Sequence, residues 1–178
     1  MPSASDAIPE ILIREADPED AAAILAYIDE VAGETDFLGF GRGEFDLDLE
    51  KETKYLEEQR DSNNSVYLLA MMDGEIAGTL SYTGGRRART RHTGELGITV
   101  RRRYWGQGIG SLLMESLIAW ARSSGVVTKL DLLVRTDNER AIQLYERMGF
   151  EREGRIRHAV HIDGVYHDAL CMGLILDQ

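Results

Sequence analysis

The chain lacks several features that would place it in a specialised class of protein. Cys171 is its only cysteine, so an internal disulfide is excluded. This residue lies in an apolar run, which predicts a buried thiol rather than a nucleophile. No apolar run approaches the roughly 20 residues of a membrane-spanning helix. The first residues do not join a basic region to an apolar stretch, so no signal peptide is evident. We therefore expect a cytoplasmic protein that does not associate with membranes.

Positive charge is also scarce, with 20 Lys and Arg residues against 31 Asp and Glu, a formal net charge of −11. General nucleic-acid binding requires a basic surface and is not expected. The acidic balance is compatible with attraction of a small cationic molecule. The length of 178 residues suits one domain with a sizeable core. We predict a single domain over residues 1–178, in which residues 1–9 form a flexible extension.

Hydrophobic periodicity and turn residues predict the order of the elements. In the second helix, Leu49, Thr53 and Leu56 are expected to form the inner face. The element order is β-α-α-β-β-β-α-β-α-β-β, which predicts an α/β (α+β) fold. Its central sheet is expected to be mixed, mostly antiparallel, and covered by helices on both faces. The predicted strands span residues 11–14, 66–72, 75–82, 93–100, 129–134, 151–162 and 165–176, and the helices span residues 18–31, 47–60, 109–124 and 139–148.

The last two strands form a hairpin that contains three of the four histidines. A two-residue turn at Asp163-Gly164 would pair Val160 with His167. Regular alternation would then place His158 and His167 on one face of the hairpin and His161 on the other. Two ligands at most do not make a zinc site, so no metal is expected.

A glycine-rich segment precedes the third helix. Glycines at three alternate positions, Gly106, Gly108 and Gly110, expose backbone N–H groups where a helix begins, which favours binding of a phosphate. Their spacing departs from the dinucleotide fingerprint, and no Gly-Lys pair is available for a P-loop. The run Arg103-Tyr104-Trp105-Gly106-Gln107-Gly108 resembles the coenzyme A loop of the GNAT acyltransferases. An ordinary glycine-rich turn is the alternative.

A second segment strengthens this resemblance. From Asn138, an Ala follows three positions on, then Leu-Tyr and finally Gly149-Phe150, which is similar to the second signature of GNAT acetyltransferases. The two motifs stand in the family's order, so the resemblance covers nearly the whole chain and implies the acyl-CoA N-acyltransferase fold. The terminal hairpin, over residues 166–174, further resembles the branch containing ribosomal-protein N-terminal and polyamine acetyltransferases.

The resemblance implies that acetyl-CoA, the co-substrate, binds in a V-shaped gap between the parallel strands that end near Val100 and Val134. Amides of its pantetheine arm would pair with one strand as a pseudo-strand, and its pyrophosphate would lie on the glycine-rich segment. Of the three consecutive arginines 101–103, one at most is expected to touch phosphate, and a structural role is the alternative for Arg103. The expected cofactor contacts are Ile98, Thr99, Val100, Arg103, Gly106, Gln107, Gly108, Ile109, Gly110, Ser111, Asn138 and Tyr145.

Acetyl transfer to an amine sets three requirements. The ammonium, with a pKa near 10.4, must lose a proton; Glu95 is the candidate base, with His92 as the alternative. The thioester oxygen needs a donor, for which the Ile98 N–H is suited. The departing thiolate needs a proton, and the resemblance implies that Tyr145 supplies it; simple packing of this tyrosine is the alternative.

An acidic and aromatic loop after the first helix is the candidate acceptor site. Glu34, Asp36 and Phe37 would bind a cationic amine, and a merely solvated loop is the alternative. We expect an acetyl-CoA-dependent N-acetyltransferase whose acceptor is a primary amine, either a small amine or polyamine or a protein N-terminus. The competing hypotheses are a non-catalytic acyl-CoA-binding module and a nucleotide-binding regulatory domain. A homodimer stays open, since the long terminal hairpin offers an edge.

Overall fold

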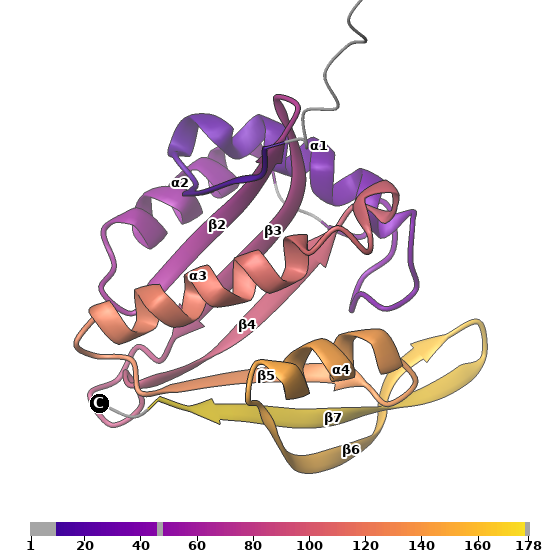
Figure 1. Ribbon diagram of the computed structural model, residues 1–178. Helices are drawn as coiled ribbons and strands as arrows, with labels where there is room; N and C mark the ends of the chain where they lie inside the picture. The colour runs from indigo at the N-terminus through magenta and orange to yellow at the C-terminus, as the bar shows by residue number, and fades with distance from the viewer. Residues whose placement is uncertain (1–9, 46–47, 177–178) are drawn as a thin grey trace, which may run out of the picture.

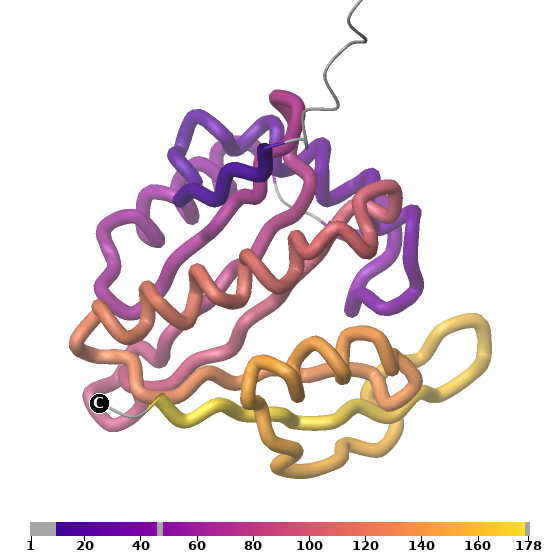
Figure 2. Tube along the Cα trace, in the orientation of Figure 1, coloured from indigo at the N-terminus to yellow at the C-terminus, as the bar shows by residue number. Residues whose placement is uncertain are grey.

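The computed structural model describes residues 10–45 and 48–176, so the extension predicted for residues 1–9 and the expected helix start at residue 47 lie outside the described residues. One seven-stranded sheet has the order β1-β2-β3-β4-β5-β7-β6 (Figures 1 and 2). All neighbouring strands are antiparallel except β4 and β5. The predicted mixed, mostly antiparallel sheet is therefore confirmed.

The elements follow the predicted order, with ends that differ by at most three residues. Short 3-10 turns, Pro18–Asp20 and Arg102–Tyr104, precede two of the helices. The strands are β1 (Leu12–Glu15), β2 (Ser65–Met72), β3 (Glu75–Gly84), β4 (Thr93–Val100), β5 (Lys129–Arg135), β6 (Glu151–Ile162) and β7 (Val165–Ile175); the helices are α1 (Ala21–Ala32), α2 (Leu49–Arg60), α3 (Ile109–Ser123) and α4 (Glu139–Arg147).

Local sequence accounts for several of these boundaries. The Asp48 side chain accepts a hydrogen bond from the Lys51 N–H at 2.8 Å, so it caps α2. The two hairpin turns, Asp73-Gly74 and Asp163-Gly164, have positive φ at both residues, as a two-residue type I′ turn requires. Both predicted tight turns are confirmed.

The helices cover the two faces of the sheet unequally. α3 and α4 lie on the face toward the viewer in Figure 1, and their apolar side chains join a core that includes residues of β2, β3, β4, β5 and β7. α1 and α2 form a second core whose sheet members come from β2 and β3. On that side of the sheet, Leu133 of β5 is 48% exposed. The C-terminal half of the sheet is therefore covered on one face and open on the other.

The predicted inner face of α2 is partly wrong. Leu56 is buried, but Leu49 is 54% exposed, while Glu52 and Gln59 are buried. The buried stripe follows the i, i+4, i+7 spacing of residues 52, 56 and 59, and Leu49 lies one turn before it. The long polar side chains of Glu52 and Gln59 therefore occupy buried positions of α2, which the apolar pattern had not placed on its inner face.

The predicted faces of the terminal hairpin are also wrong, although Val160 pairs with His167 as expected. An irregularity between Ile156 and Val160, with His158 at φ 52°, interrupts the alternation of side chains. The rings of His158 and His161 both stack on Tyr166, at centroid distances of 4.4 and 4.3 Å. His158 thus shares its surroundings with His161 rather than with His167.

Neither a metal-binding cluster nor a membrane-spanning helix is found within the described residues. No group of three or more His, Cys, Asp or Glu side chains there could hold a metal ion. None of the helices in residues 10–45 and 48–176 is long and apolar enough to cross a membrane.

Candidate active site

The site begins where β4 and β5 separate. These strands pair only where residues 93–95 lie beside residues 129–131. Beyond that point β4 continues along β3 to Val100, and β5 continues along β7 to Arg135. The two strands diverge from their paired ends in Figure 1. The two strands therefore separate into the V-shaped gap that the family resemblance implies.

One edge of this gap is unpaired backbone of β4. The Arg101 N–H donates to the Ala77 carbonyl and the Gly85 N–H to the Thr93 carbonyl, each at 2.9 Å. Odd-numbered residues of β4 therefore bond to β3, and the even-numbered ones direct their backbone groups toward β5. Ile98 and Val100 lie past the last β5 pair, so their N–H and C=O groups face the gap; Trp105 Nε1 donates to the Val100 carbonyl at 2.8 Å.

Thr99 is placed differently from its neighbours. Its backbone is on the odd-numbered register that faces β3. Its hydroxyl lies 3.0 Å from the Tyr27 hydroxyl and 2.9 Å from the Thr79 hydroxyl. Burial raises the pKa of Tyr27, so this phenol stays protonated. The sequence pattern did not identify this cluster, whose members come from three separate elements.

The glycine-rich segment has the geometry of an anion cradle. Gly106 and Gly108 adopt φ of 81° and 82°, and a Cβ at either position would meet nothing within 4 Å. The first backbone bond of α3 joins the Leu112 N–H to the Gly108 carbonyl. In the described part of the chain, the backbone N–H groups from Gly106 to Ser111 have no protein acceptor. Six unpaired donors thus lie at the positive end of a 15-residue helix, which fits a diphosphate.

Gly110 has a different role from the other two glycines. A Cβ there would lie 3.1 Å from a methyl carbon of Leu144 on α4. The third glycine therefore permits close packing of α3 on α4 rather than shaping the cradle.

The arginines beside the cradle divide into two groups. Arg101 pairs with Glu30 and donates from Nε to the Ile76 carbonyl at 2.8 Å, and Arg103 pairs with Glu75. Within the described residues, neither Arg102 nor Arg140 forms an ion pair; their guanidinium carbons lie 5.7 and 4.9 Å from the centre of the Trp105 ring. Arg103, which occupies the motif position, is thus engaged by an acid, while two other arginines are free.

Arg140 is the member of this group that the sequence reading missed. It lies in the first turn of α4, two residues after Asn138, so its place within the second motif was the available signal. The Asn138 side chain accepts from the Ala141 N–H at 3.3 Å. This cap uses only its carbonyl oxygen, so the amide N–H₂ is left to donate elsewhere.

Tyr145 projects from α4 into the α3 side of the core. Its ring lies 6.0 Å from that of Phe150, and burial raises the pKa of its hydroxyl to about 12. No side chain in the described ranges hydrogen-bonds this hydroxyl. Its oxygen is not completely enclosed by the protein. The phenol is therefore neutral at ordinary pH and has a proton available.

Glu95 lies at the point where the gap opens, on the other side of the sheet. Its neighbour Leu96 is buried in the α3 core, so alternation places the exposed Glu95 on the α1 side. Opposite it, Asp131 is occupied by Thr93 and by Lys129, whose Nζ is 2.6 Å away. His92, the alternative base, lies before β4 at the closed end of the gap. Tyr145 and Glu95 thus approach the gap from opposite faces.

The three expected acceptor residues lie in the loop after α1, where each of them makes a specific contact. Glu34 Oε2 accepts from the Arg102 N–H at 2.7 Å, and the Asp36 carbonyl accepts from Arg135 Nη1 at 2.8 Å. The Phe37 ring lies 4.9 Å from the Arg135 guanidinium. The Asp36 carboxylate is exposed.

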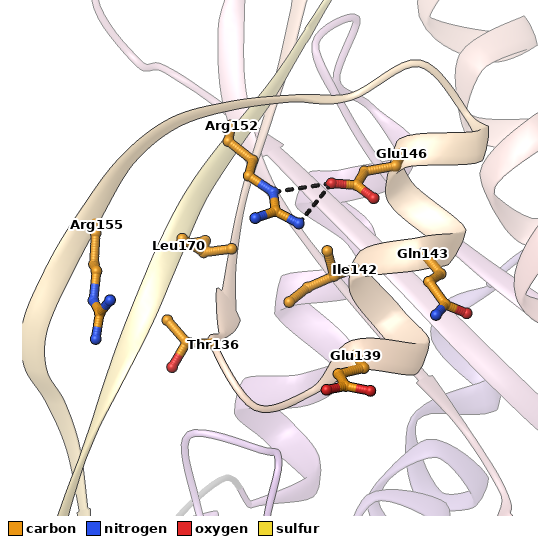
Figure 3. Close-up of a pocket in the computed structure, with 8 residues that line it drawn as sticks. All are labelled: Thr136, Glu139, Ile142, Gln143, Glu146, Arg152, Arg155 and Leu170. Atoms are coloured by element: carbon orange, nitrogen blue, oxygen red, sulfur yellow. Dashed lines mark hydrogen bonds and ion pairs between the residues drawn. The ribbon is translucent and has the colours of Figure 1, made fainter.

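A separate hollow of about 480 Å³ lies behind α4, between this helix and the β6–β7 hairpin (Figure 3). An ion pair between Arg152 and Glu146 borders it, at 2.8 Å. Its lining is Thr136, Glu139, Ile142, Gln143, Glu146, Arg152, Arg155 and Leu170. None of the residues expected to bind cofactor or acceptor contributes to it.

Comparison with known proteins agrees with this geometry. Residues 41–150 match the model of the acetyltransferase (GNAT) family. A solved GNAT-family acetyltransferase from Streptococcus pneumoniae is 40% identical, with a TM-score of 0.91 over 94% of this chain and all of that one. The L-amino acid N-acetyltransferase AaaT of Escherichia coli is 33% identical over 108 residues, which are 61% of this chain and 67% of that protein.

Further relatives represent the two activities named by the resemblance. A spermidine N(1)-acetyltransferase of Escherichia coli is 29% identical over 60% of this chain and 56% of that protein. A ribosomal-protein-alanine N-acetyltransferase from Brucella melitensis is 30% identical, with a TM-score of 0.80 over 93% of this chain and 99% of that one. The yncA protein of Salmonella typhimurium, solved with its cofactor acetyl-CoA, shares the fold at 24% identity and a TM-score of 0.81 over 94% of this chain and 95% of that one. This chain belongs to the GNAT family and is an N-acetyltransferase.

Proposed function

We propose that this enzyme transfers an acetyl group from acetyl-CoA to a primary amine of a small molecule by direct attack of the amine on the thioester. The observation that carries the proposal is the opening between β4 and β5, with the N–H and C=O of Ile98 and the N–H of Val100 left unpaired on its edge. The six unpaired N–H groups of the cradle lie at the start of the adjoining helix. Together these donors and acceptors match the amides and the diphosphate of coenzyme A.

The residues around the gap would then divide the chemistry. Glu95 accepts a proton from the incoming ammonium, directly or through water, so that the amine can form the new C–N bond. The Ile98 N–H donates to the carbonyl oxygen as it gains charge. Tyr145 donates its proton to the sulfur as the C–S bond breaks and regains one from solvent. Acetyl-CoA supplies the thioester whose acyl group is transferred.

The acceptor class rests on charge and on the named activities of relatives. The net charge of −11 and the exposed carboxylates of Glu95 and Asp36 favour a cationic amine over an anionic acceptor. AaaT is named for L-amino acids and another relative for spermidine, both small amines. These features favour a small molecule over a protein N-terminus.

A panel of acceptors assayed for release of free CoA tests the proposal. It contains L-amino acids, alkyl amines, spermidine and short peptides with free N-termini, each at the same concentration of acetyl-CoA. We expect small amines to stimulate CoA release above the rate without acceptor. CoA release that is stimulated only by peptides would contradict a small-molecule acceptor and indicate a protein N-terminus instead. Tight CoA binding without any stimulated release would contradict acetyl transfer to amines.

A further inference from the structure

Arg135 forms an unusual junction at the open end of the gap. It is the last residue of β5 and is only 8% exposed. Its Nη1 donates to the Asp36 carbonyl at 2.8 Å, and its Nε and Nη2 reach the two carboxylate oxygens of Asp137 at 3.0 and 2.6 Å. Nη2 also lies 3.0 Å from His167 Nδ1 on β7. One buried cation thus joins the loop after α1, the turn after β5 and strand β7.

The contacts of this guanidinium leave it no free nitrogen. Nε, Nη1 and Nη2 all have acceptors within the protein, and the Phe37 ring covers the group at 4.9 Å. A guanidinium that recognises a carboxylate presents a free fork of donors. Arg135 therefore presents no free fork to an acceptor, and we expect it to act through the segments that it holds.

The loop held by Arg135 is also fastened to the other arm of the gap. Glu34 accepts from the Arg102 N–H, two residues beyond the end of β4 and next to the cradle. Residues 34–37, called the strap below, therefore contact the continuation of β4 at one end and the end of β5 at the other. Because β4 and β5 no longer pair there, the strap is a short connection between the two arms at the mouth of the gap.

We infer that Arg135 is a positioning residue for acetyl transfer: it fixes the strap across the mouth of the gap and thereby sets where the acceptor amine enters. This rests on the proposed function, which places the acceptor on the strap side of the sheet. Fixing the strap limits the directions from which an amine can approach the thioester, and misplacement of about 1 Å far from the reacting atoms can cost about 100-fold in rate.

Arg135→Met tests the inference, because it keeps an unbranched apolar stem and removes the hydrogen bond from Arg135 to the strap. The partner Asp137 is half exposed, so the variant leaves no carboxylate buried alone. We expect kcat/KM for the acceptor to fall about 10- to 100-fold, through a higher acceptor KM, while the KM for acetyl-CoA changes less than about twofold. Amide hydrogen exchange in residues 33–38 should accelerate. Arg135→Lys keeps the charge without the fork and should restore part of the loss.

Arg14→Met is the matched control. Arg14 forms a two-bond pair with Asp20 at 2.7 and 2.8 Å on β1, at the opposite edge of the sheet. It should match Arg135→Met in loss of an ion pair but leave both KM values unchanged. Glu34→Ala, at the other end of the strap, should raise the acceptor KM in the same direction as Arg135→Met.

The possible results separate this inference from the proposed function. Faster exchange in the strap with an unchanged acceptor KM would overturn the positioning role, and unchanged exchange would overturn the fastening itself. If the wild-type enzyme acetylates none of the amines, the proposed function fails, while the exchange measurement still reports on the strap. Equal rises in the KM values for acceptor and acetyl-CoA would indicate general damage and would also contradict the inference.

Discussion

The two sides of the gap differ in how they are packed. β2 is buried along nearly all of its length and β3 at most positions, between α3 on one face and α1 with α2 on the other. On the far side, β6 is exposed at almost every residue, and β5 and β7 are covered by α4 on one face only. The first side, called the closed side below, is packed on both faces of the sheet. The second, called the open side below, is packed on one face only.

This difference separates a part of the enzyme that is held by packing on both faces from a part that is held by individual contacts. The cradle and the free edge of β4 belong to the closed side, where packing holds backbone donors in place without depending on side-chain identity. The open side and the strap depend on contacts of individual side chains, such as Arg135 with the Asp36 carbonyl and with His167. The acceptor should therefore be determined mainly by residues of the open side.

The largest effect should come from Tyr145, which α4 places between the two sides. Tyr145→Phe should lower turnover about 10- to 1,000-fold, the range of general acid catalysis, without weakening CoA binding by calorimetry. Because its pKa is raised to about 12 by burial, the wild-type rate should show no loss from tyrosine ionisation below about pH 10. Tyr82→Phe, which removes a buried hydroxyl bonded to the Lys129 carbonyl at 3.1 Å, is the control; similar turnover losses in both variants would argue for packing alone.

Glu95 should give the next largest effect, since it stands where the two sides part. Glu95→Gln should reduce kcat/KM about 100-fold and abolish the acidic limb of the pH profile that a carboxylate base produces. The exposed Glu58 on α2, changed to Gln, should leave the profile intact. An acidic limb that persists in Glu95→Gln but disappears in His92→Gln would assign the proton to the histidine instead.

The cradle can be separated from the fold by two glycines of similar geometry. Gly108 (φ 82°) and Gly125 (φ 68°) stand at opposite ends of α3, and a Cβ at either meets nothing within 4 Å. Alanine at each should cost about 1–2 kcal/mol of stability. Only Gly108→Ala places a methyl group in the cradle, so only it should weaken CoA binding, by about tenfold or more. Equal affinities in titrations of the two variants would disprove a phosphate site at this helix start.

The smallest effect concerns the closed side, which contains one poorly satisfied acid. Glu52 is 1% exposed and its Oε1 has no hydrogen-bond partner; burial raises the pKa of its carboxyl. A raised pKa means that the folded state holds the proton longer than the unfolded state, so stability falls as pH rises above the usual glutamate range. Glu52→Gln should raise the melting temperature by about 2–4 °C at pH 8, corresponding to about 1 kcal/mol, and by less at pH 4. A melting temperature that shifts equally at both pH values would contradict this account.

Several elements could be predicted from the sequence because their signals are local. Asp73-Gly74 and Asp163-Gly164 specify their turns through two adjacent residues, and the glycine-rich segment fixes its own backbone. The predictions for Leu49 and His158 were wrong because apolar periodicity indicates neither how α2 docks on the sheet nor where β6 is irregular. Glu52 and Gln59 could not be identified as buried, since their stems pack where the pattern expects polar residues to face solvent.

By itself, the sequence determined the order of the elements, the glycine-rich helix start and the Asn138-to-Phe150 motif that together indicate a GNAT acetyltransferase. The tertiary structure alone decided which arginines stay free beside the cradle, which face of the sheet carries Glu95, and that Arg135 holds Asp36 across 99 positions of sequence. Backbone donors at a helix start follow from neighbouring residues. Contacts between distant segments depend on how whole strands and helices pack, so no short pattern can encode them.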